Sequence, residues 1–462
     1  MSRRSSLLTA FLVLLLTTST VSPAIALDEA DRLWLVGERA SADGLDLLAR
    51  RTLERFVERY PDDPRAARAT MLLGKARLRL GDLEPALESF RTAQKLGSAA
   101  AALEARFWEG ETLFRLKRYA DASAAYEEVQ RNDVAGALKP DAVYGYGWAE
   151  LELRHRDRAV GAFRNFLQGW PEHQLAPSAT YQLARGLAEN KTYGEALSLL
   201  TGFAAKYPGH KLVPDAQYLL GWTRLAAGET KAGLADLRAF VEKYPTHELV
   251  PEARTLATQA ALKSGDKGQL AETYESLMAQ KPPTAEALVE AFTLATKLGN
   301  VRERDAAWRR LRTEFPAHPL TQRTALDLGT AAFKRKDWKE AASFAEVAAQ
   351  TRDDTMRAEA WLLAGESELK LRHFAPAAKA FESVGAVDKV EPGVRYRALA
   401  GLGLAREEQK ELRAALSAYE AVGAKSPDPA LREWARERAT AVKSRLAKPP
   451  VAPPAAKPKA KS

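Results

Sequence analysis

Apolar residues in this chain recur at intervals of three and four positions, with charged residues between them. One such stretch has apolar side chains at Phe163, Phe166, Leu167 and Trp170, the stripe that an amphipathic α-helix turns toward a core. Proline ends such a helix because it cannot donate a backbone hydrogen bond. Aromatic–proline pairs recur along the chain, three of them in succession 37 residues apart: Tyr60-Pro61, Trp170-Pro171, Tyr207-Pro208, Tyr244-Pro245 and Phe315-Pro316. The pattern predicts tandem helices with a period of about 37 residues.

A series of small residues runs in step with the prolines, and we call its members the ladder positions. They are Gly37, Gly74, Gly110, Gly147, Ala184, Gly221, Gly329, Gly365 and Gly403. Twelve residues after each comes another small residue, and sixteen after most comes a large one, such as Phe90 or Phe163. Small residues at the ladder positions allow two antiparallel helices to approach closely. Each repeat is therefore expected to be a helix pair that stacks on its neighbours.

This pattern resembles the tetratricopeptide repeat (TPR) family, which places Leu-Gly in a first helix, Ala then Phe or Tyr in a second, and Pro at the exit. The residues that carry the resemblance most clearly are Leu73, Gly74, Ala86, Phe90 and Ala93, and then Gly147, Ala159, Phe163 and Pro171. The resemblance covers residues 30 to 430. It implies an all-α fold, an α-α superhelical solenoid of about ten TPR-like helix pairs with a C-terminal capping helix, and it implies protein or peptide partners.

Within that family, the unit that ends in residues 240–245 is similar to periplasmic TPR proteins of Gram-negative envelopes. The relatives of this kind are the outer-membrane assembly lipoprotein and the partner of the Tol-Pal system. The resemblance implies an envelope compartment and binding as the mode of action, without assigning a pathway.

Composition along the chain divides it into four expected parts. These are a signal peptide (1–26), an N-terminal TPR block (27–281), a C-terminal TPR block with its capping helix (282–446), and a disordered tail rich in Pro, Ala and Lys (447–462). Between residues 258 and 304 the ladder holds Thr258 and Phe292, and Lys281-Pro282-Pro283 interrupts the connection. We expect less regular packing there, and a hinge between the two blocks.

The first residues have the pattern of an export signal. Arg3 and Arg4 precede the apolar run Leu7–Leu16, and Ala24-Ile25-Ala26 offers small residues for cleavage. That run is too short to span a bilayer. The chain contains no cysteine, which excludes disulfides, thiolate metal sites, a cysteine nucleophile and a lipid-modified N-terminal cysteine. The prediction is a periplasmic or secreted protein with no transmembrane segment.

The formal charge of +9 indicates less than its size suggests. Without Arg3 and Arg4 of the signal and four lysines of the tail, about +3 remains, and basic residues alternate with acidic ones. A nucleic-acid binder normally shows a basic stripe, so no nucleic acid is expected as a partner. The tail lysines are either part of a spacer or make weak contact with anionic envelope surfaces. They are Lys448, Lys457, Lys459 and Lys461.

A repeating histidine suggests metal binding at first. Histidine stands two residues after four exit prolines, at His173, His210, His247 and His318. Stacked repeats lie roughly 10 Å apart, whereas zinc ligands converge to about 2 Å from the ion, so one metal cannot gather this series. We predict a turn or helix-start role instead. The sequence has no phosphate loop, His-Glu-x-x-His motif or nucleophile elbow, and we expect no enzymatic activity, cofactor or metal.

The candidate binding site is aromatic. In a TPR unit the residues three before and one after the ladder position lie on the first helix, whose exposed side lines the concave groove. At these positions the candidate groove residues are Phe107, Tyr144, Trp148, Tyr181, Arg185, Tyr218 and Trp222. Aromatic and arginine side chains are common anchors of binding surfaces. The alternative is that the tyrosines pack between neighbouring repeats, and both interpretations are open at this point.

The sequence thus predicts a non-enzymatic protein–protein interaction scaffold or adaptor in the bacterial cell envelope, which holds a peptide segment or partner domain in its groove without a cofactor. One alternative is a purely architectural part of an envelope secretion or assembly machine. Another is an accessory to an envelope hydrolase.

Overall fold

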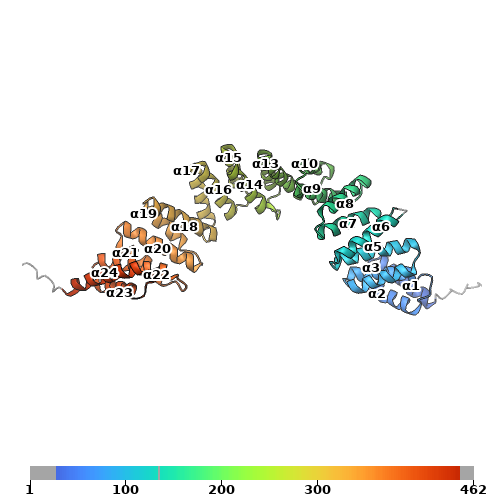
Figure 1. The fold of residues 1–462 in the computed structure, drawn as a ribbon, viewed down its shortest axis with the longest axis horizontal. Helices are drawn as coiled ribbons and strands as arrows, with labels where there is room; N and C mark the ends of the chain where they lie inside the picture. Colours follow the sequence, from blue (N-terminus) through green and yellow to red (C-terminus); the bar gives the residue numbers. More distant parts are fainter. Residues whose placement is uncertain (1–27, 134–135, 448–462) are drawn as a thin grey trace, which may run out of the picture. The chain divides into compact units, whose positions relative to one another are not determined.

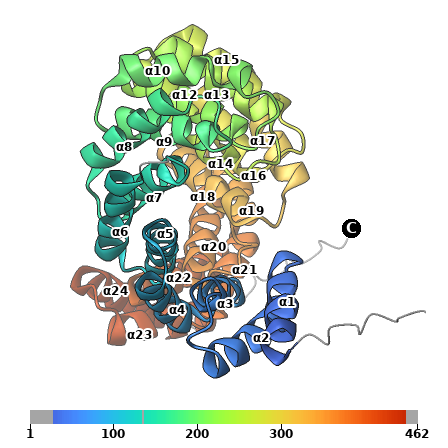
Figure 2. The same cartoon turned by 90° about the vertical axis from the view of Figure 1, so that its right-hand side faces the viewer.

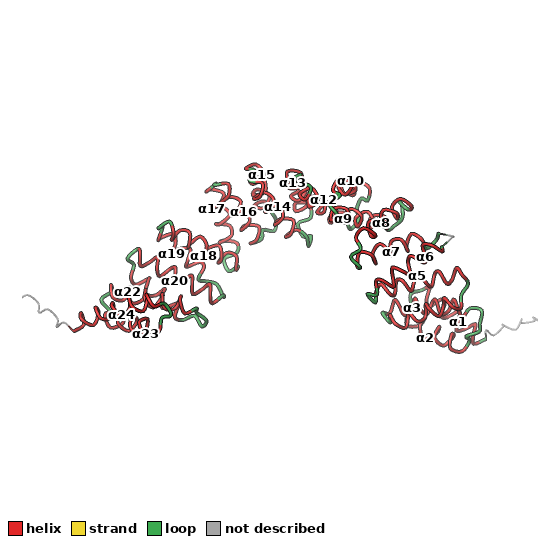
Figure 3. Tube along the Cα trace, viewed as in Figure 1, coloured by secondary structure: helices red, strands yellow, loops and turns green. Residues whose placement is uncertain are grey.

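The computed structural model describes residues 28–133 and 136–447, and these residues form 24 helices and no strand (Figures 1 and 3). The contacts divide the chain into two compact units, Met1–Val213 (unit 1) and Pro214–Ser462 (unit 2). The predicted signal peptide and residues 448–462 of the predicted tail lie outside the described residues.

Unit 1 is built from helix pairs in chain order. Its helices are α1 (Glu29–Ala42), α2 (Asp46–Arg59), α3 (Ala66–Leu80), α4 (Leu83–Leu96), α5 (Ala99–Arg115), α6 (Tyr119–Asn132), α7 (Lys139–Glu152), α8 (Arg156–Gly169), α9 (Ala176–Glu189), α10 (Tyr193–Thr201) and α11 (Phe203–Lys206). The last two form one second helix, interrupted at Gly202. Helices that are consecutive in the sequence pack against each other (Figure 2).

Unit 2 continues the same pattern and closes with an unpaired helix. Its helices are α12 (Val213–Ala226), α13 (Thr230–Lys243), α14 (Val250–Ser264), α15 (Lys267–Ala279), α16 (Ala285–Leu298), α17 (Val301–Glu314), α18 (Pro319–Lys334), α19 (Trp338–Ala348), α20 (Asp354–Lys370), α21 (Phe374–Gly385), α22 (Pro392–Glu408), α23 (Leu412–Lys425) and α24 (Pro429–Ala447). With α10 and α11 taken as one, the described helices make eleven pairs and a final helix. The predicted all-α solenoid of TPR-like pairs is confirmed.

The ladder glycines lie where a first helix touches the large residue of its own second helix. A Cβ placed on Gly74 would be 2.7 Å from the Phe90 ring, and one on Gly147 would be 2.9 Å from the Phe163 ring. The same contact joins Gly37 to Leu53, Gly110 to Tyr126, Gly221 to Leu237, Gly365 to Phe381 and Gly403 to Tyr419. These distances are below van der Waals contact, so any side chain would push the helices apart. The sixteen-residue spacing in the sequence is thus a physical contact.

Some of the same rings also fix the stacking of one repeat on the next. Tyr126 lies against its own ladder residue Gly110, and a Cβ on Gly145 of the following repeat would be 2.7 Å from its ring. Burial of the ring is nearly complete, with 1% of its surface exposed. One aromatic side chain therefore joins two helices of its own repeat to the first helix of the next.

The turn inside each regular pair has a left-handed residue seven positions after the ladder. It is Gly44, Gly81 or Gly228 in three repeats and a lysine or arginine in six: Lys117, Arg154, Lys191, Lys336, Arg372 and Lys410. At the C-terminal end of α3 the backbone amide of Asp82 donates to the Arg77 carbonyl at 2.9 Å and so caps the last turn of the helix. A left-handed conformation costs a residue other than glycine roughly 1–2 kcal/mol, and the tertiary contacts on both sides outweigh that cost.

Residues 258–304, where the sequence leaves the ladder pattern, form regular helices joined by polar contacts. The Thr258 hydroxyl donates to Glu290 at 2.8 Å, across two successive first helices, α14 and α16. Arg254, 5% exposed, donates to Gln280 at 3.1 Å and to Thr284 at 2.9 Å. Hydrogen bonds between long side chains thus replace the glycine–ring contact in this stretch.

The core continues across the predicted block boundary at 281/282. A single hydrophobic cluster includes Tyr218, Leu277, Ala287 and Ala307. The division by contacts lies instead at Val213/Pro214. A hinge between residues 258 and 304 stays a prediction.

The final helix α24 caps unit 2, as the sequence predicts for residues 431–446. It buries Ala435, Ala439 and Val442 and exposes most of its charged side chains. The carboxylate of Glu407, on α22, accepts hydrogen bonds from Arg438 and Arg445 of this helix, both at 2.6 Å. A polar outer face and a buried ionic contact are what a terminal repeat needs.

A paired substitution tests the ladder contact. In Gly147→Ala the new methyl group would overlap the buried Phe163 ring, so we expect a net loss of about 1 kcal/mol or more of unfolding free energy even after the gain in helix propensity. The control is Gly161→Ala on α8 of the same repeat, where no atom lies within 4 Å of the added Cβ and a gain of about 0.5–1 kcal/mol is expected. Denaturant unfolding measures both, and equal effects would contradict the ladder interpretation.

Candidate functional site

The two positions used to predict the groove behave differently. The position three before the ladder is mostly packed inside: Phe107 is 8% and Tyr218 9% exposed. Phe107 makes an edge contact with Trp108 and a tilted contact with Tyr126, with centroid distances of 5.4 and 6.0 Å. Both residues are thus buried, and the Phe107 and Tyr218 rings pack against a ring on the second helix of their own repeat.

The other two candidates at this position are half-buried. The Tyr144 ring lies 5.8 Å from both Phe163 and Phe166 and 6.3 Å from Trp148. Tyr181 is half-buried on α9. The Tyr144 ring therefore serves mainly the packing of the helices, with part of its surface accessible.

The position one after the ladder faces outward. It holds Trp148, Arg185 and Trp222, of which the two tryptophans are half-buried and Arg185 is exposed. Trp148 and Arg185 line one pocket of about 400 Å³ in unit 1, between the C-terminal parts of α7 and α9. Tyr218 and Trp222 belong to unit 2. In unit 1 the structure thus brings together two of the predicted groove residues in one concave place.

Charged residues make up most of the lining of the unit-1 pocket. Besides Trp148 and Arg185 it is lined by Leu151, Glu152, Arg154, Arg156, Gln182, Gly186 and Glu189. Glu189 forms ion pairs with Arg185 at 3.0 Å and with Arg156 at 3.3 Å. The carboxylate thus holds both guanidinium groups in the pocket that Trp148 also lines.

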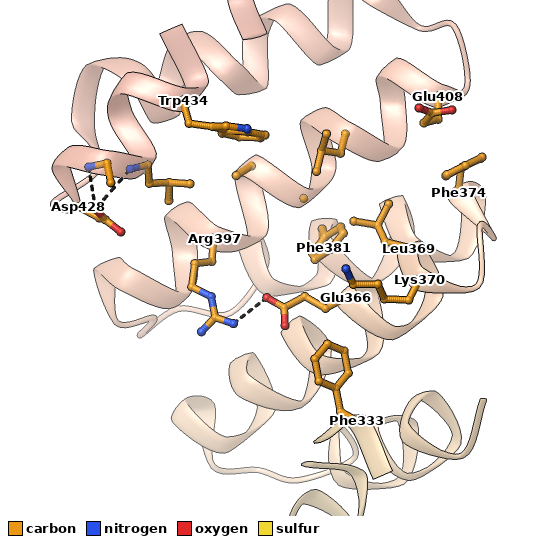
Figure 4. A pocket seen from close by; sticks show the side chains of 15 residues that line it. Phe333, Glu366, Leu369, Lys370, Phe374, Phe381, Arg397, Glu408, Asp428 and Trp434 are labelled. Atoms are coloured by element: carbon orange, nitrogen blue, oxygen red, sulfur yellow. Dashed lines mark hydrogen bonds and ion pairs between the residues drawn. The ribbon is translucent and has the colours of Figure 1, made fainter. Parts of the chain in front are cut away.

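A larger groove lies in unit 2, and we call it the unit-2 groove. It has a volume of about 800 Å³ and is formed by first helices α18, α20 and α22, the cap α24 and the start of α21 (Figure 4). Its apolar lining is Phe333, Leu369, Phe374, Phe381, Ala400, Gly401, Leu404, Ala430, Leu431 and Trp434. Its charged lining is Glu366, Lys370, Arg397, Glu408 and Asp428.

Several of the charged groups in this groove have fixed partners. Arg397 donates to Glu366 at 2.7 Å, and Asp428 accepts from the backbone amides of Ala430 and Leu431 at the start of α24 (Figure 4). Lys370 and Glu408 are exposed at the rim. The arrangement is an apolar floor with ordered charges around it, which is the composition of a peptide-binding surface.

The sequence analysis did not predict the unit-2 groove, because its candidates come from two positions of the repeats between Phe107 and Trp222 only. One after the ladder glycines of the last two repeats come Glu366 and Leu404, and both line the groove. Its aromatic rings come from other positions, such as Phe333 four after the ladder and Trp434 on the cap. Extending the rule to every repeat would have marked the right helices, but not these rings.

The repeating histidines act at turns, as the sequence predicts. In each case the ring Nδ1 accepts the backbone amide two residues later, at 3.2–3.3 Å: Leu175 to His173, Leu212 to His210, Leu249 to His247 and Leu320 to His318. Asp63 does the same for the Arg65 amide at 2.8 Å in the first repeat. The His173 ring also meets Phe166 edge-on, with 5.5 Å between centroids.

Within the described residues no group of three or more His, Asp or Glu side chains could hold a metal ion. The three buried glutamates of the described residues, Glu109, Glu150 and Glu407, all have hydrogen-bond partners. Burial alone would raise the pKa of Glu109, but hydrogen bonds from Gln94, Arg91 and Arg106 hold that pKa below its ordinary value. These carboxylates are structural. Of the described helices, none combines the length and apolar character needed to cross a membrane.

Comparison with known families identifies the repeats. Two tetratricopeptide-repeat models match, one at residues 48–101, 72–142, 144–211 and 362–429 and the other at residues 215–247, together more than half of the chain. The chain is an all-helical repeat protein, and it belongs to the tetratricopeptide repeat family. Proteins of this family are protein-interaction scaffolds and are generally not enzymes. A comparison with curated proteins gave no match.

Solved structures with the same fold include three TPR proteins. YrrB, described as a TPR protein with an unusual peptide-binding site, is 22% identical; the match covers 44% of this chain and 97% of YrrB, with a TM-score of 0.37. PilF of Pseudomonas aeruginosa is 18% identical, with coverage of 48% and 96% and a TM-score of 0.39. The C-terminal part of a TPR protein from Cytophaga hutchinsonii is 13% identical, with coverage of 61% and 95% and a TM-score of 0.41. At these identities the likeness concerns the fold alone.

The turn role of the histidines leads to a stability prediction. His173→Ala removes the acceptor for the Leu175 amide and the edge contact with Phe166, so we expect a loss of about 1 kcal/mol. His173→Asp introduces the residue that caps the equivalent turn in the first repeat and should retain the hydrogen bond. Thermal unfolding compares the two variants, and an Asp variant no more stable than the Ala variant would refute the turn role.

Proposed function

We propose that this chain is a protein-interaction scaffold of the bacterial cell envelope that holds a protein or peptide segment in the unit-2 groove. The observation that carries the proposal is the groove itself, in which aromatic and aliphatic side chains from four first-type helices face one space of about 800 Å³. A scaffold of stacked repeats presents such a surface rigidly, because the helices that form it are fixed by their ladder contacts.

The lining defines the kind of segment that fits. Burying one large apolar side chain of a ligand contributes about 1.5–3 kcal/mol, and Phe333, Leu404 and Trp434 offer apolar contact for it. Lys370 and Glu408, which end the neighbouring first helices α20 and α22, add one exposed charge of each sign to the lining and favour ligand residues of opposite charge. The proposed ligand is therefore a peptide segment with large apolar side chains and charged residues beside them.

The unit-1 pocket is the proposed second contact point. Its Trp148 supplies apolar contact, and Arg185, held by Glu189, supplies a fixed cation. Of the seven predicted groove residues, these two line the unit-1 pocket.

The unit-2 groove is tested by one substitution in its floor. Leu404→Gln places a polar group in the apolar floor, so binding should weaken by about 2 kcal/mol, or roughly 30-fold. The control is Val301→Gln, an exposed aliphatic residue of the same unit, 57% exposed and outside the groove.

Peptides selected from a random library against the wild-type protein serve as probes, and calorimetry with thermal unfolding gives the affinities and melting temperatures. The expected result is weaker binding for Leu404→Gln alone, with both variants folded. Undiminished affinity in Leu404→Gln would exclude the groove and favour the architectural alternative.

The compartment is a separate part of the proposal. It is supported by Arg3 and Arg4, the apolar run Leu7–Leu16 and the small residues Ala24-Ile25-Ala26. We expect the mature chain to begin at Leu27 in the periplasm or medium. N-terminal sequencing of the protein from fractionated cells measures this, and an intact N-terminus in the cytoplasmic fraction would remove the envelope assignment.

A further inference from the structure

Exposed aliphatic side chains concentrate at the hairpin between α1 and α2. Eight large apolar residues among the described residues are exposed, and five of them lie between residues 35 and 48. We call these five the α1–α2 patch: Leu35 (47% exposed), Val36 (45%), Leu45 (54%), Leu47 (63%) and Leu48 (44%). Such a concentration of exposed aliphatic side chains in one hairpin indicates an interaction surface.

Three of the five leave the pattern of the other repeats. Leu45, Leu47 and Leu48 stand eight, ten and eleven residues after their ladder position. The same positions hold Asp82, Glu84 and Pro85 in the second repeat, Arg118, Ala120 and Asp121 in the third, and His155, Asp157 and Arg158 in the fourth. Because these positions are accessible throughout the series, a leucine there contributes nothing to the fold of its own repeat. Their apolar character points to contact with another surface.

The outer face of α1 excludes a further TPR pair as the occupant. In later repeats, two residues of the first helix are small and fully buried: the one five positions before the ladder position and the one two positions after it. Examples are Ala69 and Ala76 on α3 and Ala142 and Ala149 on α7. On α1 these two positions hold Arg32 and Arg39. A repeat stacked on α1 in solenoid register would bury the guanidinium group of Arg32 and the ion pair of Arg39 with Asp43, and removing these charges from water is unfavourable. Stacking of one chain's end on another's start is therefore unfavourable.

The charges beside the patch are nearly balanced, with seven carboxylates and six guanidinium groups in residues 29–59, and several of them are paired. Arg39 pairs with Asp43 at 2.8 Å, with 79% and 42% of the two side chains exposed. Arg50 pairs with Asp82 at 2.7 Å and Arg79 with Asp46 at 2.6 Å. A surface with at least as many carboxylates as guanidinium groups has no excess positive charge for an anionic membrane. It is complementary to itself, because Arg39 of one copy can meet Asp43 of a second copy related by a two-fold axis.

We infer that the α1–α2 patch is the interface of a symmetric dimer of this chain. The five aliphatic side chains form the apolar centre, and the Arg39–Asp43 pairs exchange across the two-fold axis at the rim. The dimer joins two chains through α1 and α2 of unit 1, and the unit-2 groove contributes no residue to this interface. The inference is independent of the proposed function of that groove.

The first experiment measures the mass of the full chain by sedimentation velocity between about 1 and 100 μM. The wild type is expected to dimerise in this range. Leu47→Asp combined with Leu48→Arg introduces the residues of the fourth repeat at accessible positions, so it should leave the melting temperature unchanged and weaken dimerisation at least 100-fold. Val301→Asp, which removes an exposed aliphatic residue outside the patch, should dimerise like the wild type.

The second experiment tests the two-fold symmetry by charge exchange. Arg39→Glu and Asp43→Lys should each be monomeric alone, because each would place like charges opposite one another in its own dimer. Mixed in equal amounts they should form a heterodimer, in which both pairs are restored. A monomeric wild type at every concentration, or a dimer that survives the Leu47→Asp/Leu48→Arg substitutions, would overturn the inference. Dimers of both single charge variants, with no preference for mixing, would overturn the symmetric arrangement.

Discussion

The contact between a ladder glycine and the large side chain sixteen residues later is the constraint on which the rest of this structure depends. It sets the distance between the two helices of a repeat, and at Tyr126 the same ring also fixes the next repeat. A ring at this position can be buried completely only if the facing residue has no side chain. The glycines and the large side chains must therefore keep the same period along the chain.

The same contact decides which residues remain available for binding. The position three before the ladder points toward the rings of its own second helix, as Tyr144 does toward Phe163 and Phe166, so its chemistry serves packing. One residue after the ladder, the chain has turned far enough to face outward. That position tolerates Trp148, Arg185, Glu366 and Leu404 without altering the stack, and these residues line the two concave sites.

The period, the all-helical fold, the turn histidines and the capping helix could be predicted from the sequence, because each depends on contacts at a fixed spacing along the chain. The sites could be predicted only in part. Whether Phe107 is exposed depends on Trp108 and Tyr126, and whether Phe333 and Trp434 meet in one groove depends on how successive first helices splay. The polar contacts of Arg254 were equally hidden, since its partners lie 26 and 30 residues away and outside the repeat pattern.

In a stack whose repeats contact only their neighbours, the ends need different chemistry from the middle. At α24 the exposed side is polar, and the inner side is fixed by Val442 and by the ionic contact of Arg438 and Arg445 with Glu407, so this end needs no further partner. At α1 two arginines prevent the stacking of another repeat, yet the adjacent hairpin has leucines where every regular repeat is polar or small. A helix end that only had to stop the stack would resemble α24. The arginines of α1 disfavour a stacked TPR repeat, whereas the leucines of the α1–α2 hairpin favour an apolar partner surface. A second copy of the same surface satisfies both conditions.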